Sequence, residues 1–178
     1  TKAAFDQIES ALGVATIVVN NAGITSSSKF VDMPEAEWRG VLDVNLDGVF
    51  YVAQAAARRM LAGEGGVILN MGSTNGLVGY PYYADYNASK AGVIELTRSM
   101  ALELAPDVRV NAVCPGIILT EMGRNNLGTQ AEIDKWTDAT CLKRLGEPED
   151  VVGSVAFFAG DDSAYITGQS LNVCGGII

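Results

Sequence analysis

The stretch DYNASKAG at residues 85–92 opens a predicted helix with a tyrosine and a lysine four residues apart. The helical pattern covers residues 83–104 and ends before Pro106, which cannot continue a helix. Side chains three or four residues apart share one helix face, and this face carries Tyr86, Lys90, Ile94, Thr97, Ala101 and Leu104. An ammonium group on such a stripe is unfavourable without a partner. Lys90 therefore either belongs to a site with Tyr86 or extends its head past the helix edge to water.

Four short apolar runs rich in β-branched residues lie around this helix and predict buried strands at residues 14–20, 67–71, 108–114 and 170–174. Further helices are predicted at residues 1–12, 34–61 and 147–159. Continuous apolar strands that alternate with helices are typical of a parallel sheet covered on both faces. The predicted fold class is therefore α/β, with residues 1–178 forming one domain of three layers around a doubly wound parallel sheet.

The overall charge and hydropathy exclude several kinds of partner. The chain of 178 residues has a net charge of −9 and no basic run, so it lacks the clustered cations that bind nucleic acid. No apolar run approaches the roughly 20 residues that span a bilayer, and no signal peptide pattern is present. We expect a cytoplasmic protein with no nucleic-acid or membrane partner.

The cysteines and the missing histidines restrict the chemistry. Cys114, Cys141 and Cys174 form no C-x-x-C pair, which argues against a disulfide framework and favours a reducing compartment. The chain contains no histidine, which excludes a Ser-His-Asp triad, a Cys-His dyad and any histidine-ligated metal site. We expect no metal, and acid–base chemistry falls to tyrosine, lysine, aspartate or glutamate.

Polar residues follow the carboxyl ends of the predicted strands, where ligands bind in parallel α/β sheets. Ser73 follows the strand at 67–71, the strand at 14–20 ends in NNAG at 20–23, and Pro115 and Gly116 follow the strand at 108–114. The helix that contains Tyr86 begins a short loop after Ser73. We therefore expect Ser73 and Tyr86 to meet at one rim of the sheet.

Asn45 interrupts the apolar stripe of the predicted helix at 34–61. A buried amide without a partner costs about 1–3 kcal/mol. Asn45 therefore either serves a site or satisfies a backbone group at a kink in the helix.

Residues 117–144 show no clear pattern and are too long for an ordinary connection between a strand and a helix. We predict that they form a substrate-binding lid, with Met122, Leu127 and Trp136 as its apolar contacts. The alternative is a surface excursion without function. Tyr80, Tyr82 and Tyr83 precede Tyr86 and either form an aromatic wall or pack structurally.

Together these motifs resemble the short-chain dehydrogenase/reductase family of the classical type. The matching segments, in order, are NNAG at 20–23, VNLDG at 44–48, NMGS at 70–73, YNASK at 86–90, RVNAVCPG at 109–116 and ITGQSLNVCGG at 166–176. Each motif alone is weak, but six in order cover essentially the whole chain. The resemblance implies a Rossmann-like fold in which the four strands are the family's strands 4 to 7.

The resemblance also implies catalytic roles and a cofactor, NAD or NADP. Tyr86 would exchange a proton with the substrate oxygen. Lys90 would lower the pKa of Tyr86 and hold the nicotinamide ribose. Ser73 would bind the substrate oxygen, and Asn45 would hold a water that links Lys90 to solvent. The hydride belongs to the nicotinamide.

Further cofactor contacts are implied by the strand-end motifs. Beside Tyr86 and Lys90, the matching positions are Asn21, Ala22, Gly23, Pro115, Gly116, Ile118 and Thr120. The first three would line the adenosine side, the next two would flank the nicotinamide, the backbone of Ile118 would meet its carboxamide, and Thr120 would lie near the phosphates. A purely structural role stays open for Ala22 and Pro115.

One family feature is missing. No glycine-rich turn between a strand and a helix opens the sequence, and the glycines at 63–66 follow a helix instead. We expect an upstream segment of roughly 65–80 residues in the native protein, judged by the size of such a half-domain. Without it the strand at 14–20 is an apolar edge, and the residues that select NAD or NADP are absent.

The function implied is an NAD(P)-dependent oxidoreductase that interconverts a secondary alcohol and a ketone. Both a 3-oxoacyl thioester reductase-like and a sugar or polyol dehydrogenase-like activity fit. The alternatives are a non-catalytic cofactor-sensing or scaffold protein of the same fold, and an enzyme that keeps the cofactor but runs epimerisation or dehydration. Family members usually assemble as homotetramers, so the resemblance implies a homo-oligomer (tetramer). The other expected partner is a small-molecule carbonyl or alcohol substrate.

Overall fold

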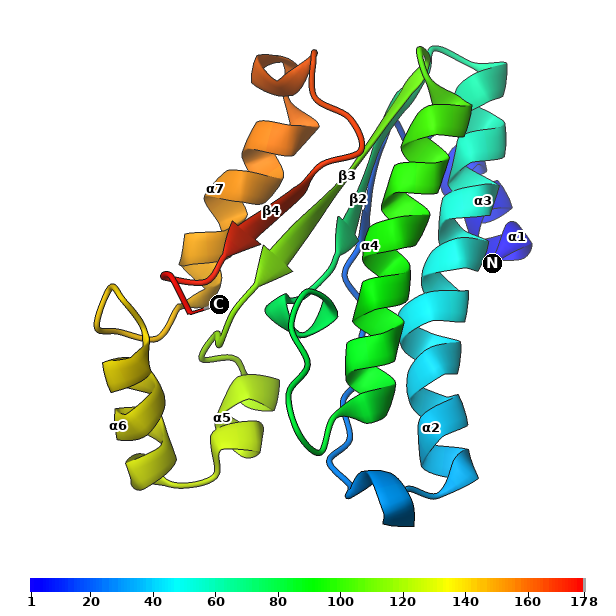
Figure 1. The fold of residues 1–178 in the computed structure, drawn as a ribbon. Coiled ribbons are helices and arrows are strands. Elements are labelled where there is room, and N and C mark those ends of the chain that lie inside the picture. Colours follow the sequence, from blue (N-terminus) through cyan, green and yellow to red (C-terminus); the bar gives the residue numbers. More distant parts are fainter. Residues whose placement is uncertain (178) are drawn as a thin grey trace.

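Four parallel strands form the middle layer of the computed structural model, which describes residues 1–177 (Figure 1). They are β1 (Ile17–Asn20), β2 (Gly66–Met71), β3 (Val108–Pro115) and β4 (Ser170–Val173), and they lie side by side in chain order. Their register places Ile17 opposite Val67, Ile68 opposite Val110 and Ala112 opposite Ser170. The predicted strands are confirmed, with ends that differ by up to three residues.

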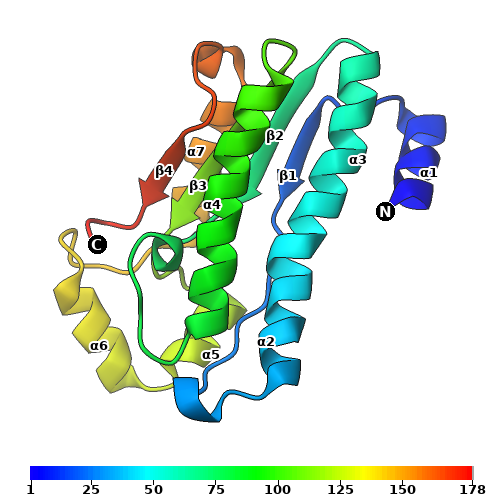
Figure 2. The same cartoon turned by 45° about the vertical axis from the view of Figure 1, so that its right-hand side comes forward.

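Helices cover both faces of this sheet (Figures 1 and 2). On one face α3 (Gly48–Ala62) and α4 (Ala84–Leu104) pack against Ile68 and Val110. On the other face α7 (Pro148–Ala159) places Phe158 against Val67 and Leu69. Successive strand residues thus enter opposite cores, as the pleat of a strand requires, and the predicted three-layer arrangement is confirmed.

The N-terminal helix α1 (Lys2–Leu12) lies beside α3 (Figure 2). Phe5 enters the same core as Ile68, and Arg59 of α3 forms ion pairs with Asp6 and Glu9. The neighbouring strand β1 is bonded to β2 alone, and the side chains of Ile17 and Val19 are 50% and 42% exposed. The expected apolar edge is therefore present in the described residues.

The predicted helix at 34–61 is three elements in one continuous rod. It consists of α2 (Glu35–Leu42), a π-helical segment (Asp43–Asp47) and α3. A short π-helical segment within an α-helix commonly marks a functional site. Asn45 occupies the middle of the π-helical segment, so the polar interruption of the stripe coincides with a real change in backbone hydrogen bonding.

The segment at 117–144 is helical, which its sequence pattern did not predict. It contains α5 (Glu121–Leu127) and α6 (Gln130–Ala139), which lie beyond the carboxyl ends of β2 and β3 (Figure 1). The hydroxyls of Thr120 and Thr129 accept hydrogen bonds from the backbone N–H groups of Gly123 and Glu132 and so cap the two helices. Leu127 is the one buried residue of the two helices, so no apolar stripe revealed them. None of the described helices has the length and apolar character that crossing a bilayer requires.

Candidate active site

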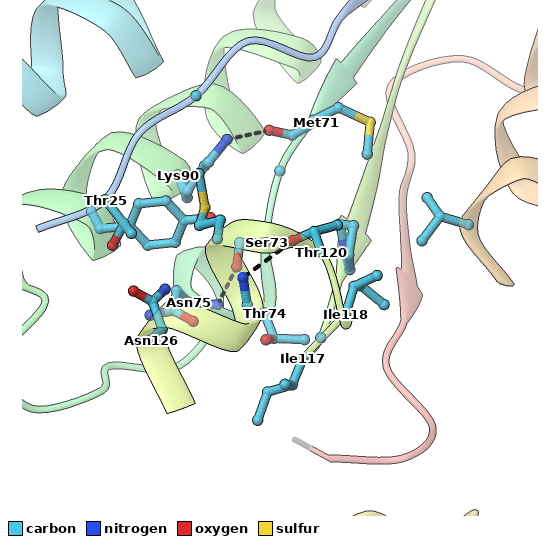
Figure 3. Close-up of a pocket in the computed structure, with 18 of the residues that line it drawn as sticks. Thr25, Met71, Ser73, Thr74, Asn75, Lys90, Ile117, Ile118, Thr120 and Asn126 are labelled. Atoms are coloured by element: carbon cyan, nitrogen blue, oxygen red, sulfur yellow. Dashed lines mark hydrogen bonds between the residues drawn. The ribbon is translucent and has the colours of Figure 1, made fainter. Parts of the chain in front are cut away.

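A cavity of about 870 Å³ opens at the carboxyl ends of the strands (Figure 3). Its wall is built from the loops that follow β1, β2 and β3, the first turns of α4, and parts of α5, α6 and α7. The volume lies in the range of small-molecule and cofactor pockets, about 300–1,000 Å³. The strand-end motifs of the sequence therefore converge on one site.

Nearly all of the residues predicted to act in a site line this cavity. Its wall includes Asn21, Ala22, Gly23, Ser73, Tyr86, Lys90, Pro115, Gly116, Ile118 and Thr120. Asn45 lies behind the wall and is fully buried. Among residues 1–177 no group of three or more cysteine, aspartate or glutamate side chains is placed to hold a metal ion.

Lys90 is buried, and a strand carbonyl holds its head. The side chain is 4% exposed, and Nζ donates a 2.7 Å hydrogen bond to the backbone oxygen of Met71 at the end of β2 (Figure 3). The lysine therefore does not extend to water. Burial lowers its pKa to about 8, and the nearby Cys114 thiol opposes this shift. Because an ammonium group carries three donors, Lys90 retains donors for a ligand beside the bond to Met71.

Tyr86 lies in the first turn of α4, with the nitrogen of Lys90 5.6 Å from the centre of its ring. Burial raises the pKa of the Tyr86 phenol, and the hydrogen bond with the Ser73 side chain only partly offsets this. Desolvation is thus the largest effect on this phenol in the protein alone. A lowering of the Tyr86 pKa by Lys90 stays a prediction.

Ser73 is brought against Tyr86 by a tight turn. Ser73 follows β2, is 6% exposed, and accepts a 3.1 Å hydrogen bond from the backbone N–H of Asn75. Gly76 in the same turn lies directly on α4, since a Cβ atom there would sit 2.7 Å from the backbone carbon and oxygen of Lys90. The turn is thus pressed onto the helix that carries Tyr86, and Ser73 is near enough to the phenol of Tyr86 to act on its pKa.

Asn45 clamps the loop that follows β1. Its Oδ1 accepts from the backbone N–H of Ile24 at 2.8 Å, and its Nδ2 donates to the backbone oxygen of Ile24 at 2.8 Å and to Ser89 Oγ at 3.2 Å. The backbone groups that Asn45 satisfies thus belong to the loop after β1 and not to a kink in its own helix. A bound water next to Asn45 stays a prediction.

The wall near Lys90 fits a nucleotide ribose by its chemistry. A Cβ atom on Gly23 would lie 3.4 Å from Asn45 Oδ1 and 3.6 Å from Lys90 Nζ, so bare backbone forms the wall at this point. An ammonium group and a phenol next to bare backbone supply donors and an acceptor for sugar hydroxyls. The residues present therefore suit the ribose of a nicotinamide cofactor.

The backbone at Ile118 is fixed on the opposite wall. The residues on both sides of Ile118 pair with Gly146, through bonds of 2.8 Å from Leu119 N and 3.0 Å to Ile117 O. The oxygen of Ile118 accepts from the N–H of Thr120 at 2.8 Å. A short bridge thus holds Ile118 in place at the cavity.

The predicted lid residues also border the cavity. Met122, Leu127 and Trp136 line it, and the Trp136 ring meets the edge of Tyr80 at 6.1 Å between centroids. Among the aromatic residues before Tyr86, those that line the cavity are Tyr80 and Tyr83, whereas Tyr82 is 55% exposed.

Some wall residues had no signal in the sequence. Beyond the predicted positions, the wall includes Thr25, Asn75, Asn126, Val151, Val152 and Val155. The valines belong to α7, whose apolar character reads as ordinary core packing. The amides and Thr25 lie in or beside loops, and their approach to the cavity depends on the loop conformations.

Comparison with known proteins identifies relatives along the whole chain. Residues 1–178 match a family model described as enoyl-(acyl carrier protein) reductase. A 3-oxoacyl-[acyl-carrier-protein] reductase from Staphylococcus epidermidis is 43% identical over 172 residues, which are 96% of this chain and 70% of the relative. The L-rhamnose 1-dehydrogenase (NAD(P)(+)) of Azotobacter vinelandii is 40% identical over 169 residues, 94% of this chain and 66% of the relative.

Solved structures give the same result at the level of the fold. A gluconate 5-dehydrogenase from Burkholderia cenocepacia, in complex with NADP and tartrate, superposes with a TM-score of 0.96 at 36% identity. The match covers 99% of this chain and 69% of that one. The ligand-free aldohexose dehydrogenase of Thermoplasma acidophilum gives 0.95 at 36% identity, over 99% of this chain and 72% of that one.

Proposed function

The chain belongs to the short-chain dehydrogenase/reductase family of NAD(P)-dependent oxidoreductases, and we propose that it interconverts a secondary alcohol and a ketone in the cavity at the strand ends. The observation that carries this proposal is that Ser73 and Tyr86 meet in the cavity wall, with Lys90 buried on the same helix face as Tyr86. Hydroxyl groups at this rim can bind a carbonyl oxygen and give it a proton.

The residues of the chain supply binding and protons. A nicotinamide, when bound, supplies the hydride for the carbonyl carbon. The Ser73 hydroxyl donates a hydrogen bond to the substrate oxygen and stabilises the charge that develops there. Tyr86 is a neutral phenol at neutral pH because burial raises its pKa, so it gives its proton to that oxygen. Ketone, hydride and proton then make the alcohol, and the charge of Lys90 stabilises the phenolate left on Tyr86.

The cofactor roles of the other wall residues are part of this proposal. Lys90 would hold the nicotinamide ribose, and the fixed backbone at Ile118 would bind the carboxamide. Asn21, Ala22 and Gly23 would line the adenosine side, Pro115 and Gly116 would flank the nicotinamide, and Thr120 would lie near the phosphates. The capping bond from Gly123 to Thr120 Oγ1 leaves that hydroxyl its own proton to donate.

The substrate side of the cavity favours uncharged groups next to the reacting carbon. Apart from tyrosines, the ionisable side chains of the described wall are Lys90 and Glu121. The remaining contacts come from aromatic rings, the side chains of Met122 and Leu127, and the amides of Asn75 and Asn126. A sugar, a polyol and a 3-oxoacyl chain all satisfy this surface, and residues 117–144 would form the lid over it.

A substrate panel tests the proposed function. The native protein is assayed with NADH and NADPH against aldoses, polyols, a 3-oxoacyl thioester and an enoyl thioester, with cofactor absorbance as the readout. We expect turnover of a ketone or secondary alcohol, and loss of it in Tyr86→Phe. Turnover of the enoyl thioester alone would show that the protein reduces a carbon–carbon double bond and not a carbonyl group. Cofactor binding without any turnover would favour the cofactor-sensing alternative.

Assembly and location complete the proposal. We infer a homotetramer from the assembly usual in the family, and large apolar side chains exposed on the outer helices support self-association, with Phe50 and Tyr51 on α3 and Leu102 on α4 at 41%, 56% and 86%. Light scattering during size-exclusion chromatography tests this, and a monomer would contradict it.

Three free cysteines support a cytoplasmic location, because thiols stay reduced there. Cell fractionation checks that location.

A further inference from the structure

Asp85 is a fully buried acid directly before Tyr86 that the proposed chemistry does not use. Its side chain is 0% exposed, and none of the ion pairs among residues 1–177 includes it. A buried carboxylate without a cation is unfavourable unless hydrogen bonds satisfy it. Its contacts therefore indicate what keeps it in this place.

Both oxygens of Asp85 accept hydrogen bonds. Oδ1 accepts from the backbone N–H of Tyr86 at 2.7 Å, and Oδ2 accepts from the hydroxyl of Ser26. Tyr83, at the N-cap of α4, makes no side-chain capping bond. The first N–H groups of a helix have no partner within the helix, so Asp85 caps α4 at the residue that carries the catalytic hydroxyl.

Ser26 belongs to the loop that forms the cofactor side of the cavity. The same loop contains Gly23 in the cavity wall and Ile24, whose backbone groups are bound by Asn45. Two residues further on, the N–H of Ser28 donates to the oxygen of Tyr82 at 2.9 Å. The loop is thus joined to the start of α4 at two neighbouring points, of which Asp85 is the buried one.

A second path joins Tyr86 to the same loop. Ser89 Oγ donates to the backbone oxygen of Tyr86 at 2.8 Å and accepts from Asn45 Nδ2 at 3.2 Å. Asn45 in turn holds Ile24. The backbone of Tyr86 is therefore bound at its N–H by Asp85 and at its oxygen by Ser89, and both paths end in the loop after β1.

We propose that Asp85 is a positioning residue: by joining Ser26 to the N–H of Tyr86, it fixes the catalytic hydroxyl relative to the cofactor wall. The inference rests on the proposed function. Asp85 contacts the backbone N–H of Tyr86 and not its phenol, so its proposed action is through geometry and not through its charge. An amide of the same shape can keep that geometry, because its oxygen still accepts from Tyr86 and its NH₂ can donate to Ser26 Oγ.

Kinetics of Asp85→Ala and Asp85→Asn test the proposal in the native protein. Misplacing a reacting group by about 1 Å costs about 100-fold in rate. We therefore expect kcat of Asp85→Ala to fall between about 10-fold and 100-fold with substrate KM changed less than about threefold. Asp85→Asn should restore kcat to within about threefold of the wild type. Glu103→Ala is the matched control, because Glu103 is an exposed acid on the same helix, and it should change neither constant.

Amide hydrogen exchange gives a readout that does not need turnover. In Asp85→Ala and in Ser26→Ala, exchange should become faster at the Tyr86 amide and in residues 24–28, and in Glu103→Ala it should not. If Asp85→Ala does not fold, Ser26→Ala carries the test, with a smaller fall in kcat in the same direction. If the variants show these exchange differences but the wild type shows no turnover, the proposed function is wrong and the positioning role of Asp85 is not.

Two results would overturn the positioning role. One is an active wild type in which kcat and Tyr86 exchange stay within about twofold in both Asp85→Ala and Ser26→Ala. The other is Asp85→Asn as slow as Asp85→Ala, which would show that the charge of Asp85 and not its hydrogen-bond geometry is required.

Discussion

Lys90 lies on the same face of α4 as Tyr86, with its nitrogen 5.6 Å from the centre of the tyrosine ring. The ammonium group donates its hydrogen bond to the backbone carbonyl of Met71, at 2.7 Å, and not to the Tyr86 hydroxyl. The end of β2 thus holds the cation next to the tyrosine ring. The Tyr86 hydroxyl is left to Ser73 and to a ligand in the cavity.

Replacing Lys90 by methionine separates its role in activity from its role in stability. Lys90→Met removes the cation that stabilises the Tyr86 phenolate, so we expect kcat/KM to fall by about 100-fold or more. An apolar side chain of similar length suits a site that is 4% exposed, so Tm should stay unchanged or rise. Steady-state kinetics and thermal unfolding check both. A variant with a lower Tm but normal kcat/KM would contradict the proposed role.

The burial of Lys90 also predicts a pH dependence of stability. Its pKa is about 8 in the folded protein against an ordinary value of 10.5. Between these values the unfolded chain binds a proton that the folded chain does not, so the free energy of unfolding rises with pH in this window. The full effect is of the order of 3 kcal/mol. This gain in the free energy of unfolding is complete above pH 10.5 and is lost as the pH falls to about 8.

Chemical denaturation at pH 7.5 to 10.5, compared between the wild type and Lys90→Met, isolates this contribution. Burial also raises the pKa values of Tyr86 and Cys114, and these groups act in the opposite direction, so the difference between the two proteins is the meaningful quantity. Parallel stability curves for the two proteins would show that Lys90 keeps an ordinary pKa.

The positions of the strands and the pairing of Tyr86 with Lys90 could be predicted from the sequence because they depend on local patterns. Apolar β-branched runs identify buried strands, and a spacing of four residues places two side chains on one helix face. Asn45 was conspicuous for the same reason, since an amide interrupted a regular stripe. The π-helical backbone around it was not predictable, because one widened turn of five residues shifts the stripe too little to stand out from the α-helical pattern on either side.

The features that could not be predicted depend on burial by segments that are distant in the sequence. Asp85 in the first turn of a helix reads as an exposed acid near the helix dipole, and only the loop with Ser26 buries it. The direction of the Tyr86 pKa likewise depends on desolvation, which outweighs the opposing effect of Ser73. Residue spacing contains neither quantity.

The raised pKa of Tyr86 predicts opposite pH profiles for the two reaction directions. Reduction uses the neutral phenol, so its rate should be flat near neutral pH and fall only as the phenol ionises at high pH. Oxidation of the alcohol needs the phenolate and should speed up with rising pH. Profiles of kcat/KM in both directions check this. An oxidation rate that is independent of pH up to about 10, the ordinary pKa of tyrosine, would contradict Tyr86 as the base.

Tyr86→Phe tests the hydroxyl itself. The phenylalanine ring keeps the packing of the first turn of α4 but cannot donate a proton, so we expect kcat to fall by about 100-fold to 10,000-fold. Binding of NADH or NADPH, measured by fluorescence titration, should change little because Lys90 is intact. Loss of cofactor binding together with activity would instead assign Tyr86 chiefly to the cofactor.

Trp136 is the residue through which the proposed lid can be tested. Its ring borders the cavity and meets Tyr80 edge to face at 6.1 Å, and its Nε1 donates to Glu132 at 3.1 Å within α6. Trp136→Ala removes this wall, so substrate KM should rise by about tenfold while the cofactor Kd stays within about twofold. Tyr165→Ala is the control, because Tyr165 is fully exposed and lies outside the cavity wall. An unchanged substrate KM in Trp136→Ala would contradict the lid role of α6. An equal rise of KM in Trp136→Ala and Tyr165→Ala would show that losing any aromatic side chain has this effect.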